Sequence, residues 1–327
     1  MSGVGKLPVF MVLAALGFGV RQSPPEKTAG PPPLRMPFAR VRAEGVFTIP
    51  ALTGLGTTAD AVWAVSRSPA AVMRIDPKDN SLGKPVELTA VPCGGAAAEF
   101  GALWVPLCSE PGLARIDVKT LAVTTTPVPG LVASAGSLTT GIGSVWMLAD
   151  GKGTVLRLDP DTGRAVADVY VAQGSSAIAF GLKAIWTAGG DANQVIRINP
   201  HTNLIEATIP AGKAPRSIAV GENAIWVLSQ GDGTVIRIDP VSNRIAATID
   251  LGVSLAGGSI AAGEGSVWVA APGAPLSRID PRTNRLVQQF SSEGGGGPLA
   301  VAHRSLWIAV SADTLWRVDP KFVEALR

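Results

Sequence analysis

The sequence predicts an all-β fold, a seven-bladed β-propeller with four short strands in each blade. Three observations predict it: a tryptophan-centred unit of about forty residues that recurs along the chain, a four-strand pattern inside each unit, and a spare strand that can close the ring. The composition agrees with this fold, because 38 Gly and 26 Pro among 327 residues are too many turn-forming residues for a helical bundle.

Tryptophans mark the repeat. They are spaced by 41, 42, 40, 40, 42 and 39 residues, and each lies in a short apolar strand such as "AIWVL". A run of small residues such as "RSIAVG" precedes each one, and a strand with a basic–apolar–acidic end and a further run such as "IAATI" follow it. Each unit therefore has four strands, whereas the coils of a β-helix are about half as long. The repeat tryptophans are Trp63, Trp104, Trp146, Trp186, Trp226, Trp268 and Trp307.

The two ends of the repeat array predict how the ring closes. The last unit runs out at "LWRVDPKFVEALR" and lacks a fourth strand, whereas a spare strand, "GVFTIPA" at 45–51, precedes the first unit. If this strand pairs beside the last unit, it completes the seventh blade and leaves no open sheet edge between the first and last units.

The repeated Arg-x-Asp-Pro step is predicted to be architectural. In the copy at 236–240, Arg237 and Asp239 share one face of a strand and the apolar residues share the other. Pro240 fixes φ at the first turn position, and Asp239 can accept backbone N–H bonds two or three residues further on. A feature present in every unit does not distinguish an active site, and the repeat tryptophans are likewise expected to pack between blades rather than to hold a cofactor.

The N-terminal 44 residues differ in composition from the rest. Residues 1–20 are predicted to be a signal peptide or a short membrane anchor, because Lys6 is followed by fourteen uncharged residues at 7–20. Residues 21–44 hold six prolines and are predicted to form an extended, mobile tether, which leaves 45–327 for the propeller. We therefore expect a periplasmic or extracellular protein, tethered to the membrane through residues 7–20 if the signal is not cleaved.

The net charge of +3 comes from the N-terminal segment. Residues 1–45 hold six basic and two acidic residues, which leaves 22 basic against 23 acidic residues for 46–327. The ring is thus close to neutral, which argues against nucleic acid as a partner.

The two cysteines of the chain predict one disulfide in an exported protein, the alternative being two buried free thiols. Cys93 lies just before the first strand of the second unit, and Cys108 lies just after its second strand. Both positions fall on the same face of one blade, where a bond would hold two loops together.

The stretch "ATIPAGKAPRSIAVGENAIWVLSQGDGTVIRIDPVSNRIAATI" resembles the YVTN-type repeat of YncE-like seven-bladed propellers, with Trp226 where that family often has Tyr. The wider group includes NHL-type and streptogramin-lyase-like propellers. The resemblance covers about residues 45–327 and is specific for the fold. It is unspecific for function, because members include enzymes, DNA-binding proteins and envelope proteins.

In such rings, ligands usually meet the face made by the loops before the first strand and between the second and third strands of each blade. Counting back from the tryptophans places mostly small residues at the mouth of the channel on this face. Ten residues before each Trp lie Thr53, Gly94, Gly136, Ser176, Arg216, Gly258 and Gly297, and nine before lie Gly54, Gly95, Ser137, Ala177, Ser217, Ser259 and Pro298.

Polar residues in the loops of this face are the candidate ligand-binding residues. Lys213 and Arg216 form a close pair of bases near the mouth, which could meet an anionic ligand or pair with an acid of a neighbouring blade. The polar loop residues also lie at Gly-rich turns, where such residues are expected for turn chemistry alone. The candidates are Arg67, Glu110, Asp191, Lys213, Arg216 and Asp232.

The sequence favours an exported, non-catalytic recognition or scaffold propeller that binds an envelope protein partner, or a small ligand, on one face. The alternative is a metal-dependent lyase or hydrolase acting at the channel mouth, since streptogramin-lyase-like enzymes use histidines, a carboxylate and a metal there. His201 and His303 both fall on the opposite face, so we predict no catalytic residues, no metal site and no cofactor. Membrane contact is expected only through an uncleaved N-terminal segment.

Overall fold

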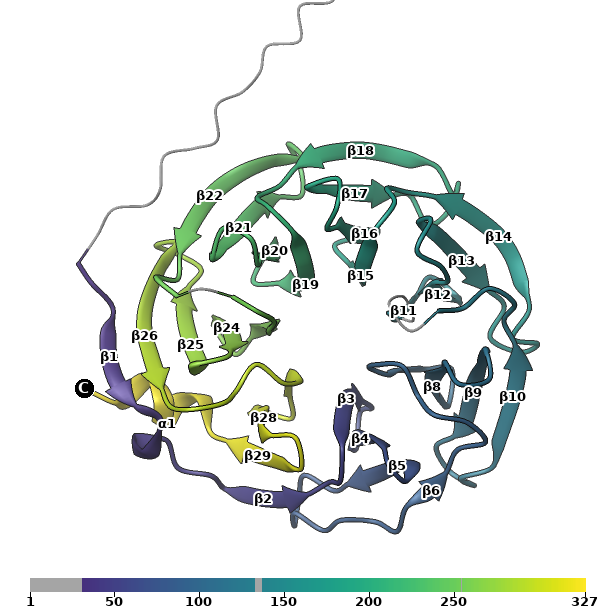
Figure 1. Cartoon of the computed structure of the whole chain (residues 1–327), viewed down its shortest axis with the longest axis horizontal. Coiled ribbons are helices and arrows are strands. Elements are labelled where there is room, and N and C mark those ends of the chain that lie inside the picture. Colours follow the sequence, from purple (N-terminus) through teal and green to yellow (C-terminus); the bar gives the residue numbers. More distant parts are fainter. Residues whose placement is uncertain (1–30, 133–136, 254) are drawn as a thin grey trace, which may run out of the picture.

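The protein is described by a computed structural model that places residues 31–132, 137–253 and 255–327. Its strands form seven sheets arranged as blades around a central channel, which confirms the predicted fold class (Figure 1). The first strand of each blade lies nearest the channel and the last lies at the rim. The predicted signal or anchor at 1–20 and the first part of the predicted tether, 21–30, lie outside the described residues.

The repeat strands of each blade form an antiparallel sheet and follow one another in sequence, and blades six and seven each gain one strand from the N-terminal side. Blades one to three contain β3 (Leu52–Thr57), β4 (Val62–Arg67), β5 (Ala70–Ile75) and β6 (Val86–Glu87); β7 (Ala97–Glu99), β8 (Ala102–Leu107), β9 (Gly112–Asp117) and β10 (Val123–Pro127); and β11 (Leu138–Gly141), β12 (Ser144–Leu148), β13 (Thr154–Leu158) and β14 (Ala165–Tyr170). Blades four and five contain β15 (Ser175–Gly181), β16 (Ala184–Gly189), β17 (Gln194–Ile198) and β18 (Ile205–Pro210); and β19 (Pro215–Gly221), β20 (Ala224–Ser229), β21 (Thr234–Asp239) and β22 (Arg244–Asp250). Blades six and seven contain β23 (Ser259–Gly263), β24 (Ser266–Ala271), β25 (Ala274–Asp280) and β26 (Arg285–Ser291); and β27 (Leu299–Ala302), β28 (Ser305–Ser311) and β29 (Thr314–Val318).

The repeat tryptophans all lie on the second strand of their blades and are at most 1% exposed. Each buried indole N–H donates to an acceptor five residues earlier in the chain. That of Trp226 donates to the carbonyl oxygen of Gly221 at 3.0 Å. The apolar neighbours of these tryptophans form a series of clusters that join adjacent blades, such as the one around Trp226 that reaches Ile260 and Val269 of blade six. The core is therefore a ring of blade-to-blade contacts rather than a single central core.

The ring closes with a strand from the N-terminal side of the repeats. β2 (Gly45–Thr48) pairs antiparallel with β29 and becomes the fourth strand of blade seven, as predicted for 45–51. The Phe47 ring is buried and lies 5.8 Å from the ring of Trp307, so the added strand also joins the core of that blade.

Residues 34–41 differ from the mobile tether predicted for 21–44. β1 (Leu34–Pro37) pairs parallel with β26 as a fifth strand of blade six, and a 3₁₀ turn (Phe38–Arg40) follows. Met36, Phe38 and Val41 are buried in one cluster with Trp268. The apolar residues among the prolines supply enough buried area to hold this segment, which we call the N-terminal strap (residues 34–41), against the ring.

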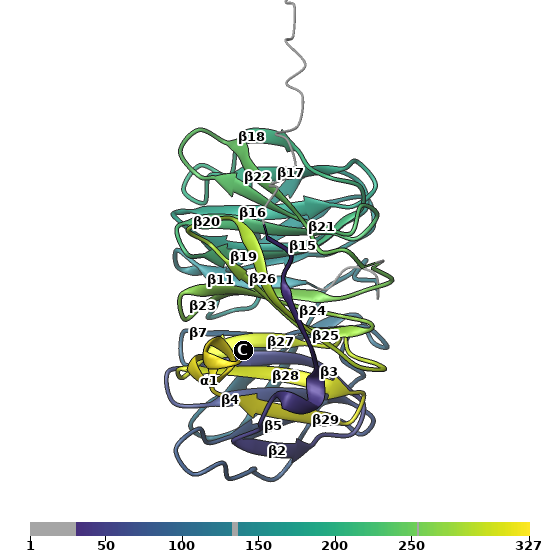
Figure 2. The same ribbon diagram turned by 90° about the vertical axis from the view of Figure 1, so that its left-hand side faces the viewer.

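The chain ends in a short helix, α1 (Pro320–Ala325), that packs beside the strap. Asp319 accepts the backbone N–H of Lys321 at its N-terminus, and Val323 is fully buried in the same cluster as the strap. Figure 2 shows the strap in purple on the side of the ring near α1 and the C-terminus in yellow. Within the described part of the chain, no helix is long and apolar enough to span a membrane.

Candidate functional site

The ring has two faces with different loops. We call the face made by the loops before each first strand and between the second and third strands the mouth face. We call the opposite face, made by the turns between the first and second and between the third and fourth strands, the turn face. All six candidate ligand residues lie on the mouth face, whereas His201 and His303 lie on the turn face.

The mouth face opens into a cavity of about 480 Å³ at the channel. The cavity is lined mainly by glycines, hydroxyl groups and small apolar side chains from the first strands of several blades. Among the described residues that line it there is no acid, base or imidazole. Its lining includes Thr53, Gly54, Gly95, Ser137, Ser217, Gly258, Ser259, Gly297 and Pro298 from the predicted positions, while Gly136 lies outside the described residues.

A second cavity of about 560 Å³ adjoins the first at Gly296, Gly297 and Pro298. It is formed by the loop before β27, where the sequence reads "EGGGGP". Gly295 has φ of +87°, and a Cβ there would lie 2.7 Å from the Cβ of Pro275, so this loop position requires glycine. The positions counted back from the tryptophans did not predict this second cavity, although the run of four glycines indicated an unusual loop.

The candidate base Arg216 pairs with the candidate acid Asp191 across two blades. Its Nη2 lies 3.2 Å from Asp191 Oδ1, and its guanidinium lies over the backbone of Gly190. Both side chains are well exposed, 41% and 63%, so the pair contributes little to stability. Of the two roles predicted for Arg216, the structure has the pairing with a neighbouring blade's acid.

Other polar residues of the mouth face hold loops together. Asp232 Oδ2 accepts the backbone N–H of Lys213 at 2.6 Å, and Asp313 Oδ1 accepts that of Ala51 at 2.7 Å. Asp150 accepts the backbone N–H groups of two residues in its own turn, which lowers the pKa of its carboxyl against the opposing effect of its partial burial. Most of the polar variety of this face is therefore turn chemistry.

The structure does not gather the six candidates into one site. Arg67 ends β4 of blade one, and Glu110 lies in the turn after β8 of blade two; both are exposed. The other four form the contacts Arg216–Asp191 and Lys213–Asp232 between the loops of blades four and five. A shared ligand would have to be large enough to reach across several blades.

Cys93 and Cys108 form a disulfide on the mouth face of blade two, with their Cα atoms 5.2 Å apart. The backbone on either side pairs as well, because Cys93 N donates to Pro106 O at 3.0 Å and Cys108 N donates to Val91 O at 2.9 Å. The bond therefore extends the pairing of β8 by fixing the loop that precedes β7.

The two histidines are turn residues. His201 follows Asn199, whose side chain accepts the His201 backbone N–H at 2.8 Å. His303 has φ of +53° between β27 and β28 and its Nε2 lies 3.2 Å from the carbonyl of Ala61. His303 also lines a polar cavity of about 470 Å³ on the turn face, with Glu44 and Glu264. In the described residues, no group of three His, Cys, Asp or Glu is arranged to hold a metal ion.

The repeated Asp-Pro turns build the turn face. Asp239 Oδ1 accepts the backbone N–H groups of Val241 at 3.0 Å and Ser242 at 2.7 Å, as predicted for the step. The hydrogen bond from Ser242 N is the main reason that the pKa of Asp239 lies below its usual range.

The arginine of the Arg-x-Asp-Pro step has a role that we did not predict from the sequence. The Arg237 guanidinium lies 5.3 Å above the ring centre of Trp226 in its own blade. Its Nη1 donates to Asn284 Oδ1 and to Pro281 O of blade six, both at 2.8 Å. We call the bond from a repeat Arg to the turn Asn of the next blade a clasp. The Asn at the fifth position of the turn was the signal that could have predicted it.

Comparison with known proteins bears on the fold. No family model and no curated protein matches the chain. Streptogramin B lyase superposes with a TM-score of 0.73 at 18% identity, over 84% of this chain and 96% of that one. A chain of the mitotic checkpoint complex (TM-score 0.71, 16% identity, covering 86% and 96%) and BamB from Moraxella catarrhalis (0.61, 13%, covering 83% and 83%) are also similar. At these identities the likeness shows the fold alone, and it places the chain among propellers of the kind seen in streptogramin B lyase.

Proposed function

We propose that this chain is an exported recognition or scaffold propeller of the YVTN-type, YncE-like kind, which binds an envelope protein partner on one face of the ring. A small ligand at the mouth is compatible with the same role. The export part of the proposal rests on the apolar run at 7–20, and the location is periplasmic or extracellular.

The observation that carries the proposal is how the mouth face uses its polar groups. The described lining of the channel cavity offers hydroxyl groups and backbone but no group that could act as an acid or base. Asp313 and Asp232 on this face accept backbone N–H groups, and Asp191 pairs with a guanidinium. Acids that already hold neighbouring loops in place suit a preorganised binding face better than acid–base catalysis.

The alternative is a metal-dependent lyase or hydrolase at the mouth, and its support is the fold that the chain shares with streptogramin B lyase. The shared fold alone is a weak argument, because one fold hosts many functions. A stoichiometric divalent ion in the purified ring, lost when mouth residues are changed, would favour this alternative over the binding role.

The test is crosslinking and mass spectrometry of the native protein in a mildly solubilised envelope extract. Lysines report on the two faces separately: Lys152 and Lys213 lie on the mouth face, whereas Lys119 and Lys183 lie on the turn face. We expect a large assembly in which one of these pairs crosslinks to a partner and the other does not. Migration as a bare monomer, or crosslinks spread evenly over both faces, would contradict the proposal.

A further inference from the structure

The repeat arginines of the ring are unequal in their bonding. Within the described parts of the chain, six of them make hydrogen bonds or ion pairs through the guanidinium: Arg74, Arg157, Arg197, Arg237, Arg278 and Arg317. Arg115 of blade two is the exception. Its Nε is buried without a hydrogen-bond partner, and its contact is with the face of the Trp104 ring, 5.7 Å from the ring centre.

The neighbouring blade explains the difference. Clasps run from Arg157 to Asn203, from Arg197 to Asn243, from Arg237 to Asn284 and from Arg317 to Asn80, at 2.8 to 3.1 Å. Arg278 bonds Glu324 of α1 instead, at 2.8 Å. The residue that stands opposite Arg115 is Gly163, which has the same positive φ as the clasp asparagines but no side chain to accept a bond.

Gly163 belongs to the interface that Arg115 faces. A Cβ on Gly163 would lie 2.6 Å from Oγ1 of Thr126, on the outer strand of blade two. A second acceptor is also missing: Arg157 Nε donates to Ser144 Oγ at 2.8 Å, whereas Ala102 occupies the matching position before Trp104. The half-buried Arg115 guanidinium interacts electrostatically with Asp117 of its own strand, but its Nε has no hydrogen-bond acceptor. A buried donor without an acceptor is costly, so this position favours an incoming oxygen.

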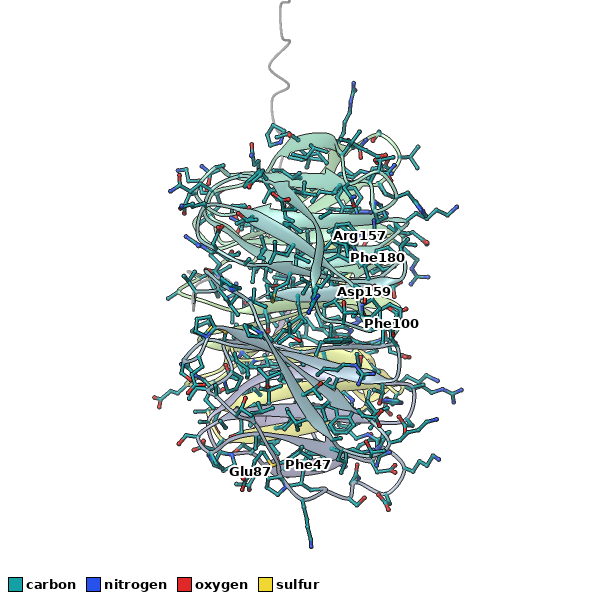
Figure 3. The ribbon with its side chains drawn as sticks, turned by 90° about the vertical axis from the view of Figure 1, so that its right-hand side faces the viewer. Phe47, Glu87, Phe100, Arg157, Asp159 and Phe180 are labelled. Atoms are coloured by element: carbon teal, nitrogen blue, oxygen red, sulfur yellow. A yellow bond between two sulfur atoms is a disulfide. The ribbon has the colours of Figure 1, made fainter. Side chains whose placement is uncertain are left out.

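Apolar side chains flank this position on the turn face. Phe100 and Ile142 occupy the turns between the first and second strands of blades two and three with φ of +57° and +50°, a conformation that bulky and β-branched residues rarely adopt. The matching turns of blades five and six carry Glu222 and Glu264. Phe100 is half-buried against the cluster of Trp104, and Ile142 is 37% exposed. In Figure 3, Phe100 lies toward the same side of the ring as Arg157 and Asp159.

We propose that the turn-face end of the interface between blades two and three binds a partner protein through an acidic side chain next to an apolar one. The carboxylate would accept from Arg115 as the asparagines do in the clasps, and the apolar side chain would cover Phe100 and Ile142. The apolar turns at positive φ and the guanidinium whose Nε lacks a hydrogen bond together match this chemistry. The inference rests on the proposed recognition role and adds a protein-binding position on the turn face.

The probe is a pair of short peptides, N-acetyl-Leu-Asp-amide and N-acetyl-Leu-Lys-amide, added to the full chain. The readout is the Nε–Hε resonance of Arg115 in an ¹H–¹⁵N spectrum. We expect the Asp peptide to shift this resonance in a saturable way and to bind at least about tenfold more tightly than the Lys peptide, since one charge-assisted hydrogen bond is worth that factor.

Two variants test the site itself. Gly163→Asn, combined with Thr126→Ala to make room, should supply the missing clasp and weaken binding of the Asp peptide about tenfold or more while the ring stays folded. Arg115→Gln should weaken it to the same degree, and Arg282→Gln, which changes an exposed arginine on the turn face of blade six, is the control that should leave it unchanged. Equal shifts with both peptides, or undiminished binding by the Gly163→Asn/Thr126→Ala variant, would overturn the proposal.

The outcome separates this inference from the proposed function. An envelope assembly that persists while the Asp peptide fails to bind would overturn the site and leave the recognition role standing. Selective peptide binding by a ring that migrates alone in extracts would contradict the envelope partner and support the site.

Discussion

The interfaces on the two sides of blade three differ at the turn position that carries the clasp asparagine. Between blades three and four, Arg157 reaches Asn203 at 3.1 Å; between blades two and three, Arg115 meets Gly163 and makes no hydrogen bond to a described residue. The tryptophans beneath both arginines are equally buried. The buried core and the clasps are therefore separate layers of the ring. Every blade has the core layer, whereas a clasp forms only where the turn of the next blade carries the asparagine.

The core layer should dominate stability at both kinds of interface. Trp226→Ala and Trp104→Ala should each lower the free energy of unfolding by about 3–5 kcal/mol, because each empties a fully buried site of the largest side chain. Denaturant unfolding followed by circular dichroism measures both. A loss of less than about 1 kcal/mol in either variant would show that the core layer is not common to the two regions.

The disulfide should give blade two a second source of stability. Cys93 and Cys108 are 15 residues apart, and removing the bond in a Cys93→Ala/Cys108→Ala variant should cost about 3 kcal/mol. Unfolding with and without reductant checks this, since reductant should affect the native chain and not the variant. If reductant lowers the stability of both equally, the effect does not come from this bond.

The clasp layer predicts unequal effects of the same substitution. Arg237→Gln should cost about 1.5–3 kcal/mol, because it leaves Asn284 Oδ1 and Pro281 O without their charged donor. Arg115→Gln removes no hydrogen bond and should cost about 0.5 kcal/mol or less. Matched unfolding curves decide the point, and equal losses would mean that the clasps do not stabilise the ring.

The smallest effect concerns pH. The folded-state pKa of Asp239 is depressed by the hydrogen bond from Ser242 N, so its contribution is present above the unfolded pKa of about 3.9 and is lost as pH falls through the lower folded value. Asp239→Asn should therefore flatten the acid limb of the stability profile below about pH 4. Asn199 in blade four shows that the turn accepts an amide. An unchanged acid limb would mean that the turn carboxylates do not set the acid sensitivity.

The regular parts of the molecule could be predicted from sequence because they repeat. The tryptophan spacing, the Arg-x-Asp-Pro step and the spare strand at 45–51 together predict the seven blades and the closing pair β2–β29. Counting ten and nine residues back from each Trp also predicts most of the channel lining, since the first strands start in the same register.

The irregular parts of the molecule could not be predicted from the sequence because they depend on contacts between distant residues. The prolines around 31–37 suggested a free tether, although the alternate spacing of the large apolar residues Met36 and Phe38 was a weak sign of a strand with one buried side. Three of the clasps join residues 46 or 47 apart and the fourth, Arg317–Asn80, joins residues 237 apart, so none could be predicted while each repeat was considered alone. For Arg216 the sequence allowed an anionic ligand or an acid of a neighbouring blade, and the ion pair with Asp191 depends on a blade-to-blade contact that the sequence does not show.

The strap and α1 bring the two ends of the described chain together, because Arg40 Nη2 lies 3.5 Å from the carbonyl oxygen of Arg327. Because these ends are adjacent, they can be joined and the chain opened elsewhere without changing the order of the blades around the ring. A circular permutant that joins residue 327 to the strap through a short linker, with new termini in the exposed turn at Ile142, should retain all seven sheets. Such a molecule would have its chain break beside the interface of blades two and three, and all blades would keep their neighbours in the ring.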